Sequence, residues 1–154
     1  MMSYEKYNSL FRLELDVLEE EKVSGYYSTN EKNELDGDFE LLSDSSGISE
    51  EFETKYEFTN NSFGQFSKNQ KTGLWKYEYV YNDGVDMYEK HTITISFKDG
   101  DCLASTFSGQ IGYIMPFTEH NFKNQKLCSA KAVREKAWEL WGLEYERRKK
   151  SGEL

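Results

Sequence analysis

The chain is short of the residues that usually build cores and active sites. Only 37% of its 154 residues are hydrophobic, against roughly 45–50% in an average soluble domain, and it has one proline, two cysteines and two histidines. No run of 18 apolar residues occurs, so we expect no membrane-spanning helix. The composition likewise argues against a coiled coil, a disulfide scaffold and a large α/β enzyme.

The scarcity of histidine and cysteine also limits the chemistry that we expect. His91 and His120 show no metal-binding spacing, and neither stands in a recognisable nucleophile motif, so we predict no metal, no cofactor and no catalytic residue. Cys102 and Cys128 are too few for a disulfide framework, and we expect both to be reduced and packed. Residues 1–6 carry neither the basic nor the apolar region of a secretory signal, which favours a cytoplasmic protein.

Aromatic residues are plentiful and offset the shortage of aliphatic ones. The chain has 10 Phe, 11 Tyr and 3 Trp, each able to bury on the order of 150–250 Å². Because the chain is too short for two secure cores, we predict a single domain over residues 1–154.

The middle of the chain has the pattern of a sheet. Apolar and polar side chains alternate in three successive runs, at 52–58, 74–81 and 93–97. A period of two is typical of strands with one buried face. Turn-forming residues separate the runs, at Asp44–Gly47, Thr59–Ser62, Asn82–Gly84 and Lys98–Gly100. We therefore predict an antiparallel β-meander of about six strands over residues 38–108.

Helices are expected on either side of this sheet. At the N-terminal end, apolar residues spaced by three and four favour a helix, although residues 11–17 also alternate as a strand would. Residues 24–37 are polar and turn-rich, and suit either a connection or a long hairpin tip. Residues 109–128 show no regular pattern.

The last segment has the clearest helical pattern. Ser129 can cap a helix over residues 129–150, in which Trp138 and Trp141 share one apolar stripe. Gly142 weakens this helix without ending it. The fold class predicted is therefore α+β, with a C-terminal and an N-terminal helix packed on one face of the sheet.

One stretch also carries a family resemblance. Residues 68–77 read Lys-Asn-Gln-Lys-Thr-Gly-Leu-Trp-Lys-Tyr, and the match over residues 68–84 resembles the repeat of MORN-like proteins in its bacterial variant. The resemblance implies stacked hairpins that form one continuous sheet and serve as a binding surface. It further implies an antitoxin role, which some bacterial members have, and supplies no catalytic residues.

The charge is uneven along the chain. The net charge is −9, but residues 129–154 carry +2 and residues 1–128 carry −11. An acidic body has the wrong sign for direct nucleic-acid binding, and the sheet region lacks the basic cluster that anionic lipid requires. We therefore predict a non-catalytic protein-binding module, most concretely an acidic inhibitor, immunity or antitoxin-type protein that occupies a basic partner.

The predicted contact residues are of two kinds. Aromatic side chains on a sheet face left uncovered by the helices would contact the partner, with acidic side chains at the rim. These residues are Trp75, Tyr77 and Tyr79 on the sheet, and Glu50, Glu51 and Glu53 at the rim.

Two other functions fit the same sequence. One is a small-molecule-binding or enzymatic domain with a pocket between sheet and helix, lined by His91, His120 or Tyr113. The convergence of both histidines with a carboxylate in a deep cleft would favour it. The other is a structural or host-interaction protein with a large exposed apolar patch or a self-complementary interface.

Overall fold

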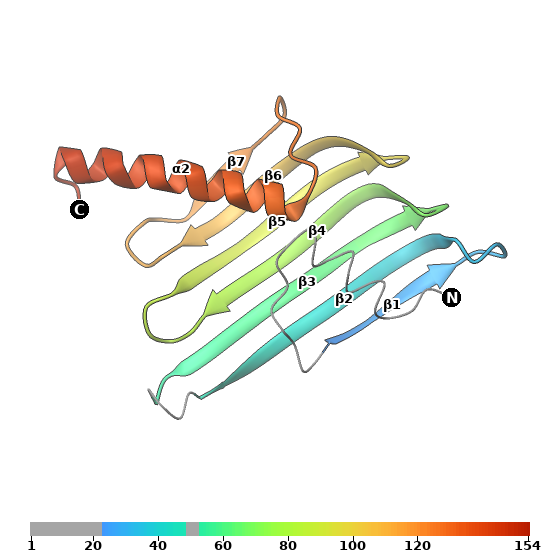
Figure 1. The fold of residues 1–154 in the computed structure, drawn as a ribbon, viewed down its shortest axis with the longest axis horizontal. Coiled ribbons are helices and arrows are strands. Elements are labelled where there is room, and N and C mark those ends of the chain that lie inside the picture. The colour runs from blue at the N-terminus through green and yellow to red at the C-terminus, as the bar shows by residue number, and fades with distance from the viewer. Residues whose placement is uncertain (1–22, 49–52) are drawn as a thin grey trace.

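The computed structural model describes residues 23–48 and 53–154, which form one antiparallel sheet and one helix. The elements are β1 (Val23–Thr29), β2 (Leu35–Ile48), β3 (Lys55–Ser67), β4 (Gln70–Asn82), β5 (Tyr88–Lys98), β6 (Asp101–Ile111), β7 (Thr118–Asn121) and α2 (Ala130–Ser151). Each strand pairs with its neighbours in sequence, so the sheet is a meander in the order β1 to β7 (Figure 1). The predicted antiparallel meander and the α+β class are confirmed.

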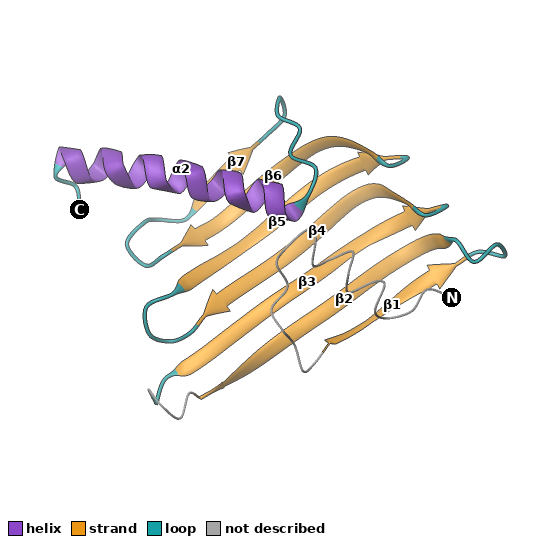
Figure 2. Ribbon diagram, in the orientation of Figure 1, coloured by secondary structure: helices purple, strands orange, loops and turns teal. Residues whose placement is uncertain are grey.

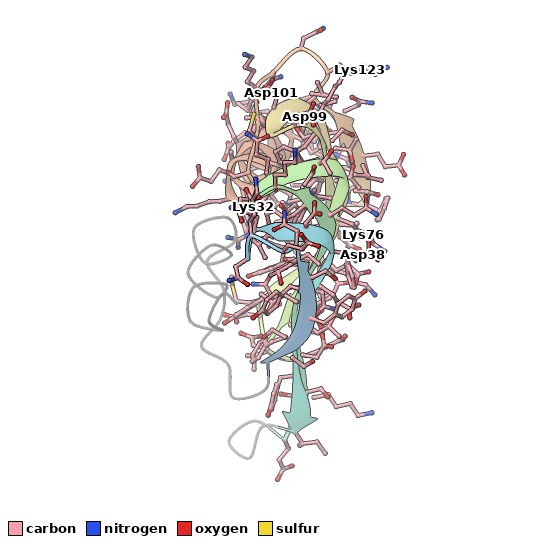
Figure 3. All side chains as sticks on the ribbon, turned by 90° about the vertical axis from the view of Figure 1, so that its right-hand side faces the viewer. Lys32, Asp38, Lys76, Asp99, Asp101 and Lys123 are labelled. Carbon is pink, nitrogen blue, oxygen red and sulfur yellow. The ribbon has the colours of Figure 1, made fainter. Side chains whose placement is uncertain are left out.

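The helix divides the sheet into two different sides. Helix α2 packs mainly on β5 and β6 and lies over the β5–β7 end of the sheet (Figure 2). We call the side against α2 the helix face and the opposite side the open face. Lys76 and Asp38 lie on the open face, as the edge-on view of Figure 3 shows. The predicted N-terminal helix falls on residues 1–22, outside the described residues.

Two of the predicted turns are where the sequence placed them. Asp99 and Gly100 have φ angles of 49° and 86° and form the tight turn between β5 and β6. The turn after Asn82 is built by side chains, because Asp83 Oδ1 accepts the backbone N–H groups of Val85, Asp86 and Met87 at 2.9–3.1 Å.

Two other predicted turns are wrong, because both segments lie inside strands. Asp44–Gly47 belongs to β2 and Thr59–Ser62 to β3. Asn60 and Ser62 are buried beside their cross-strand partners Tyr79 and Tyr77, where a small side chain leaves room for a large ring. These residues resemble a turn in composition, yet the neighbouring strand determines their conformation.

The segments flanking the predicted sheet are also more regular than expected. Residues 24–37 form the hairpin of β1 and β2, so the hairpin alternative holds. Residues 109–128 contain the end of β6 and the short edge strand β7. The described sheet therefore has seven strands and extends beyond 38–108 on both sides.

Helix α2 begins and ends as its sequence predicts. The Ser129 hydroxyl accepts the backbone N–H of Ala132 at 3.1 Å, which confirms the N-cap. The helix runs through Gly142 and ends at Gly152, which adopts a left-handed φ of 78°.

The core is built mainly from aromatic rings on the helix face. Phe39, Phe66 and Trp75 come from three neighbouring strands, and their ring centroids lie 5.0–5.6 Å apart. Trp75 and Tyr77 have no exposed surface. The aromatic content thus supplies the apolar burial that the aliphatic residues do not.

Candidate functional site

A cluster of buried polar side chains joins α2 to the sheet. Glu89 and His91 are two residues apart on β5, so both point to the helix face. The Glu89 carboxylate accepts hydrogen bonds from His91 Nε2 at 3.0 Å, from Arg134 Nε at 2.7 Å and Nη2 at 3.2 Å, and from Trp138 Nε1. Burial alone would raise the pKa of Glu89, but the donated hydrogen bonds from His91 and Arg134 outweigh it and hold that pKa below its ordinary value.

His91 is enclosed within this cluster. The His91 ring lies between Tyr79 and Phe107, 5.0 Å and 4.9 Å away between centroids, and its side chain has no exposed surface. His120 lies on the far side of Phe107, at 6.1 Å. The two histidines therefore do not converge, and the arrangement that would favour an enzyme does not form.

The burial of His91 predicts a loss of stability in acid. Burial lowers the pKa of His91 below 6.5, so the folded protein keeps the ring neutral while the unfolded chain takes up a proton below about pH 6.5. Below pH 6.5 the unfolded chain therefore binds more protons than the folded protein. The contribution of the neutral His91 ring to the free energy of unfolding is complete above pH 6.5 and is lost as the pH falls. We expect urea unfolding at pH 7.5 and pH 5 to show this loss, and H91Q to reduce it.

His120 supplies the control for that measurement. Burial also lowers the pKa of His120, so H120Q reports its separate share of the same effect. A pH 5 to 7.5 difference that H91Q leaves unchanged would contradict the assignment to His91.

A groove crosses the middle of the open face. It has a volume of about 660 Å³ and runs over β2 to β6. Its acidic side chains are Asp44, Glu57 and Glu78, and its single lysine is Lys90. Its other side chains on the open face are Thr59, Asn61, Val80, Tyr88, Thr92, Ser108, Gln110 and Phe117. This open-face groove is thus polar, with a net negative charge.

Exposed apolar side chains gather at one end of the sheet. They come from the β4–β5 and β6–β7 loops, which lie at the same end of the meander (Figure 1). We call this group the loop-end patch: Val85, Met87, Tyr113, Ile114 and Phe117, with exposed fractions between 47% and 67%. Exposed apolar clusters of this kind are typical of interaction surfaces.

The two loops that carry the patch are tied to the sheet and to each other. The Tyr113 hydroxyl donates to Asn82 Oδ1 at 3.1 Å, and its ring packs at a tilt of 33° against the Tyr88 ring, 4.9 Å away between centroids. Gln110 Nε2 donates to the carbonyl of Met115 at 3.0 Å, and Met115 itself is buried. The patch is therefore held in place before any partner binds, which lowers the entropic cost of binding.

A second groove lies between the helix and the sheet. It has a volume of about 470 Å³ and is lined by β6, the β6–β7 loop, β7 and the C-terminal half of α2. Ile111, Met115, Leu140 and Trp141 form much of its apolar wall, and His120 also lines it. We call it the helix groove. A pocket between sheet and helix is thus present, lined by one of the two histidines that the sequence suggested.

The predicted contact residues lie in different environments. Trp75, Tyr77 and Tyr79 are 0–5% exposed, so these core side chains offer no surface to a partner, and their selection as contact residues is wrong. Their rings fill the helix face, because an alternating strand buries one of its faces wherever the core forms. Glu53 is exposed at the start of the described chain after β2, whereas Glu50 and Glu51 lie outside the described residues.

Neither Glu89 nor the loop-end patch was predicted from the sequence. Glu89 and His91 share a strand face through their spacing of two, but Arg134 reaches them from a helix 45 residues away in sequence. The patch had a visible signal, since apolar residues stand in the loops at 83–87 and 112–117 where polar ones are usual.

The two cysteines lie in different environments. Cys102 is half-buried and Cys128 exposed, both as free thiols, and burial raises the pKa of Cys102 to about 12. The expectation of packing is therefore wrong for Cys128.

In the described part of the chain, no helix is long and apolar enough to span a bilayer.

The comparison with known proteins adds no relative. No protein-family model, no curated protein and no solved structure matches the chain. The MORN-like resemblance of residues 68–84 therefore remains a prediction from the sequence.

Proposed function

We propose that this protein is a non-catalytic binding module that contacts a protein partner with a basic surface. The contact would use the loop-end patch as its apolar centre and the acidic side chains of the open-face groove around it. The concrete role would be that of an inhibitor, immunity or antitoxin-type protein that occupies its partner.

The loop-end patch is the observation that carries this proposal. Binding energy at protein interfaces concentrates in a few apolar and aromatic side chains on rigid supports. Tyr113, Ile114 and Phe117 are 57–67% exposed, and the Tyr113–Asn82 and Gln110–Met115 hydrogen bonds hold their loop in place.

The open-face groove supplies the preference for a basic partner. Phe117 lines this groove as well as the patch, so the two surfaces are continuous. Asp44, Glu57 and Glu78 give the groove three carboxylates against Lys90, and Lys76 on the same face pairs with Glu78 at 3.4 Å, which still leaves the negative charge in excess. Complementary charge across an interface accelerates association and excludes acidic competitors.

Affinity purification from the native cell, in a series of salt concentrations, tests the proposal first. We expect a stoichiometric basic partner at low salt that is lost as salt rises, because screening weakens surface charge pairs. Recovery of the protein alone at low salt would overturn the proposal.

Charge neutralisation then tests the groove against the purified partner. The triple variant D44N/E57Q/E78Q is expected to weaken binding about tenfold, since each rim charge contributes roughly 0.3–1 kcal/mol. The matched control E31Q/D101N/E146Q changes the net charge equally at exposed sites outside the groove. Equal losses in both variants would leave only non-specific attraction and refute the groove as the site.

Substitution in the patch separates its contribution from the charge. F117S is expected to weaken binding about tenfold or more. L103S changes an equally exposed apolar residue on β6, away from the patch, and is expected to leave affinity within about twofold. Titration calorimetry measures both. An F117S variant that binds as the unmodified protein does would remove the patch from the interface.

A further inference from the structure

The helix groove differs from the open-face groove in both its surface and its charge. Apolar side chains form most of its wall, among them Ile111, Met115, Leu140, Trp141 and Leu143. Its volume of about 470 Å³ lies within the range of roughly 300–1,000 Å³ that small-molecule sites occupy. The groove therefore has the size and the surface for a small, largely apolar ligand.

The charged residues of this groove lie on the last turns of α2. The Arg147 guanidinium already has carboxylate partners, because it donates to Glu144 at 2.7 Å and 3.0 Å and also to Glu153. Arg148 donates to Glu144 through Nε alone, at 2.9 Å. Within the described residues, neither Nη nitrogen of Arg148 has a hydrogen-bond partner. A guanidinium fixed through Nε thus presents its two remaining amino groups to a ligand.

The local charge favours an anion at this end of the groove. On the last turns of α2, Arg147, Arg148, Lys149 and Lys150 outnumber Glu144, Glu146 and Glu153 by one positive charge, in a protein whose overall charge is −9. The carbonyl end of a helix carries roughly half a negative charge. Arg147, Arg148, Lys149 and Lys150 outweigh it. Burial lowers the pKa of His120, so above about pH 6.5 its imidazole contributes hydrogen bonding and no charge.

We propose that the helix groove binds an amphipathic carboxylate, an apolar chain or ring system that ends in a carboxyl group. The carboxylate would accept two hydrogen bonds from the Nη nitrogens of Arg148, the geometry in which guanidinium and carboxylate match. The apolar body would lie along Trp141, Leu140 and Met115. This site shares no side chain with the loop-end patch or the open-face groove, although the β6–β7 loop borders both it and the patch, and it does not rest on the proposed partner.

Three ten-carbon ligands that differ only in the head group provide the test. Decanoate, decanol and decylamine are titrated below the concentrations at which they form micelles, and binding is followed by calorimetry and by the change in tryptophan fluorescence, to which Trp141 in the groove contributes. We expect saturable binding of decanoate, weaker binding of decanol and no detectable binding of decylamine. Equal affinity for decanoate and decylamine would overturn the proposal, as would the absence of saturable decanoate binding.

Matched variants then locate the carboxylate. R148Q is expected to weaken decanoate binding about tenfold and to leave decanol binding unchanged, because only the charged hydrogen bonds are removed. K150Q removes the same charge from the same helix end outside the groove, and is expected to change affinity less than twofold. L143D places a carboxylate at the exposed wall of the groove and is expected to abolish decanoate binding. Equal effects of R148Q and K150Q would refute the assignment of Arg148.

Discussion

Replacing Glu89 by glutamine is expected to lower the free energy of unfolding by about 3 kcal/mol. The Glu89 carboxylate is 4% exposed and accepts four hydrogen bonds, from His91, Arg134 and Trp138. Removing one partner of a buried ion pair leaves the other charge poorly solvated, which costs more than the pair itself contributes. Arg134 is 25% exposed and can turn partly to solvent, which places the estimate at the lower end of the usual range.

The loss of stability in E89Q tests whether the Glu89 cluster holds α2 on the sheet. Within the described residues, α2 packs mainly on β5 and β6, and the Glu89 cluster is its main polar tie to the sheet. Urea unfolding and the melting temperature measure the effect, and for a chain of this length 3 kcal/mol corresponds to about 10 °C.

Two further variants test whether the loss of stability comes from the Glu89–Arg134 ion pair. E135Q changes an exposed glutamate on the same helix and is expected to alter stability by less than about 0.5 kcal/mol. Combining E89Q with R134M removes both charges, and is expected to recover part of the loss because no unpaired charge remains. An E89Q variant that unfolds within 1 kcal/mol of the unmodified protein would contradict the anchoring role.

Replacing Gly64 by alanine is expected to destabilise the fold by about 3 kcal/mol. A Cβ at Gly64 would lie 2.1 Å from Cδ2 and 2.2 Å from Cε2 of Trp75, closer than any non-bonded contact. The Trp75 ring has no free direction to move, since Phe39 and Phe66 pack against it and its Nε1 donates to the Gln65 carbonyl at 3.1 Å. Overpacking a rigid, enclosed ring forces strain into the surrounding strands.

The same substitution at Gly142 is the natural control. Nothing lies within 4 Å of a Cβ built there, and the residue is inside α2. G142A is therefore expected to stabilise the protein by up to about 1 kcal/mol, because alanine loses less conformational entropy in a helix than glycine does. If urea unfolding shows that G64A lowers the free energy of unfolding and G142A raises it, the lack of space beside Trp75 explains the loss in G64A. A neutral G64A would show that the ring can move.

The sequence predicted the elements whose signals are local. The alternating runs at 74–81 and 93–97 became β4 and β5, the Asp99–Gly100 dipeptide became a turn, and Ser129 became the cap of α2. Each of these signals depends on a side chain acting on its own backbone or on its immediate neighbours.

Predictions failed where a distant strand decides the conformation. Thr59–Ser62 has the composition of a turn, but the rings of Tyr77 and Tyr79 stand opposite Ser62 and Asn60 and require small side chains there. The prediction that Trp75 contacts a partner is wrong for a similar reason, because its burial depends on distant elements. Alternation shows that one face of a strand is buried without showing which faces meet the core.

The candidate sites were predicted even less completely than the fold. The acidic character of the body was visible in the sequence, and it supports the proposed preference for a basic partner. The loop-end patch combines residues from two loops that are distant in sequence, and the helix groove combines β6 with the end of α2. Such sites arise from the pairing of elements, which no local pattern encodes.

By itself, the sequence determined the class of this protein: an antiparallel aromatic sheet, a capped C-terminal helix and an acidic body with a basic end. The tertiary structure alone decided which aromatic rings are core and which are exposed, and where the apolar and charged side chains meet. The physical reason is the range of the interactions. Periodicity and capping act within a few residues, whereas burial depends on strands and a helix that the chain brings together over tens of residues.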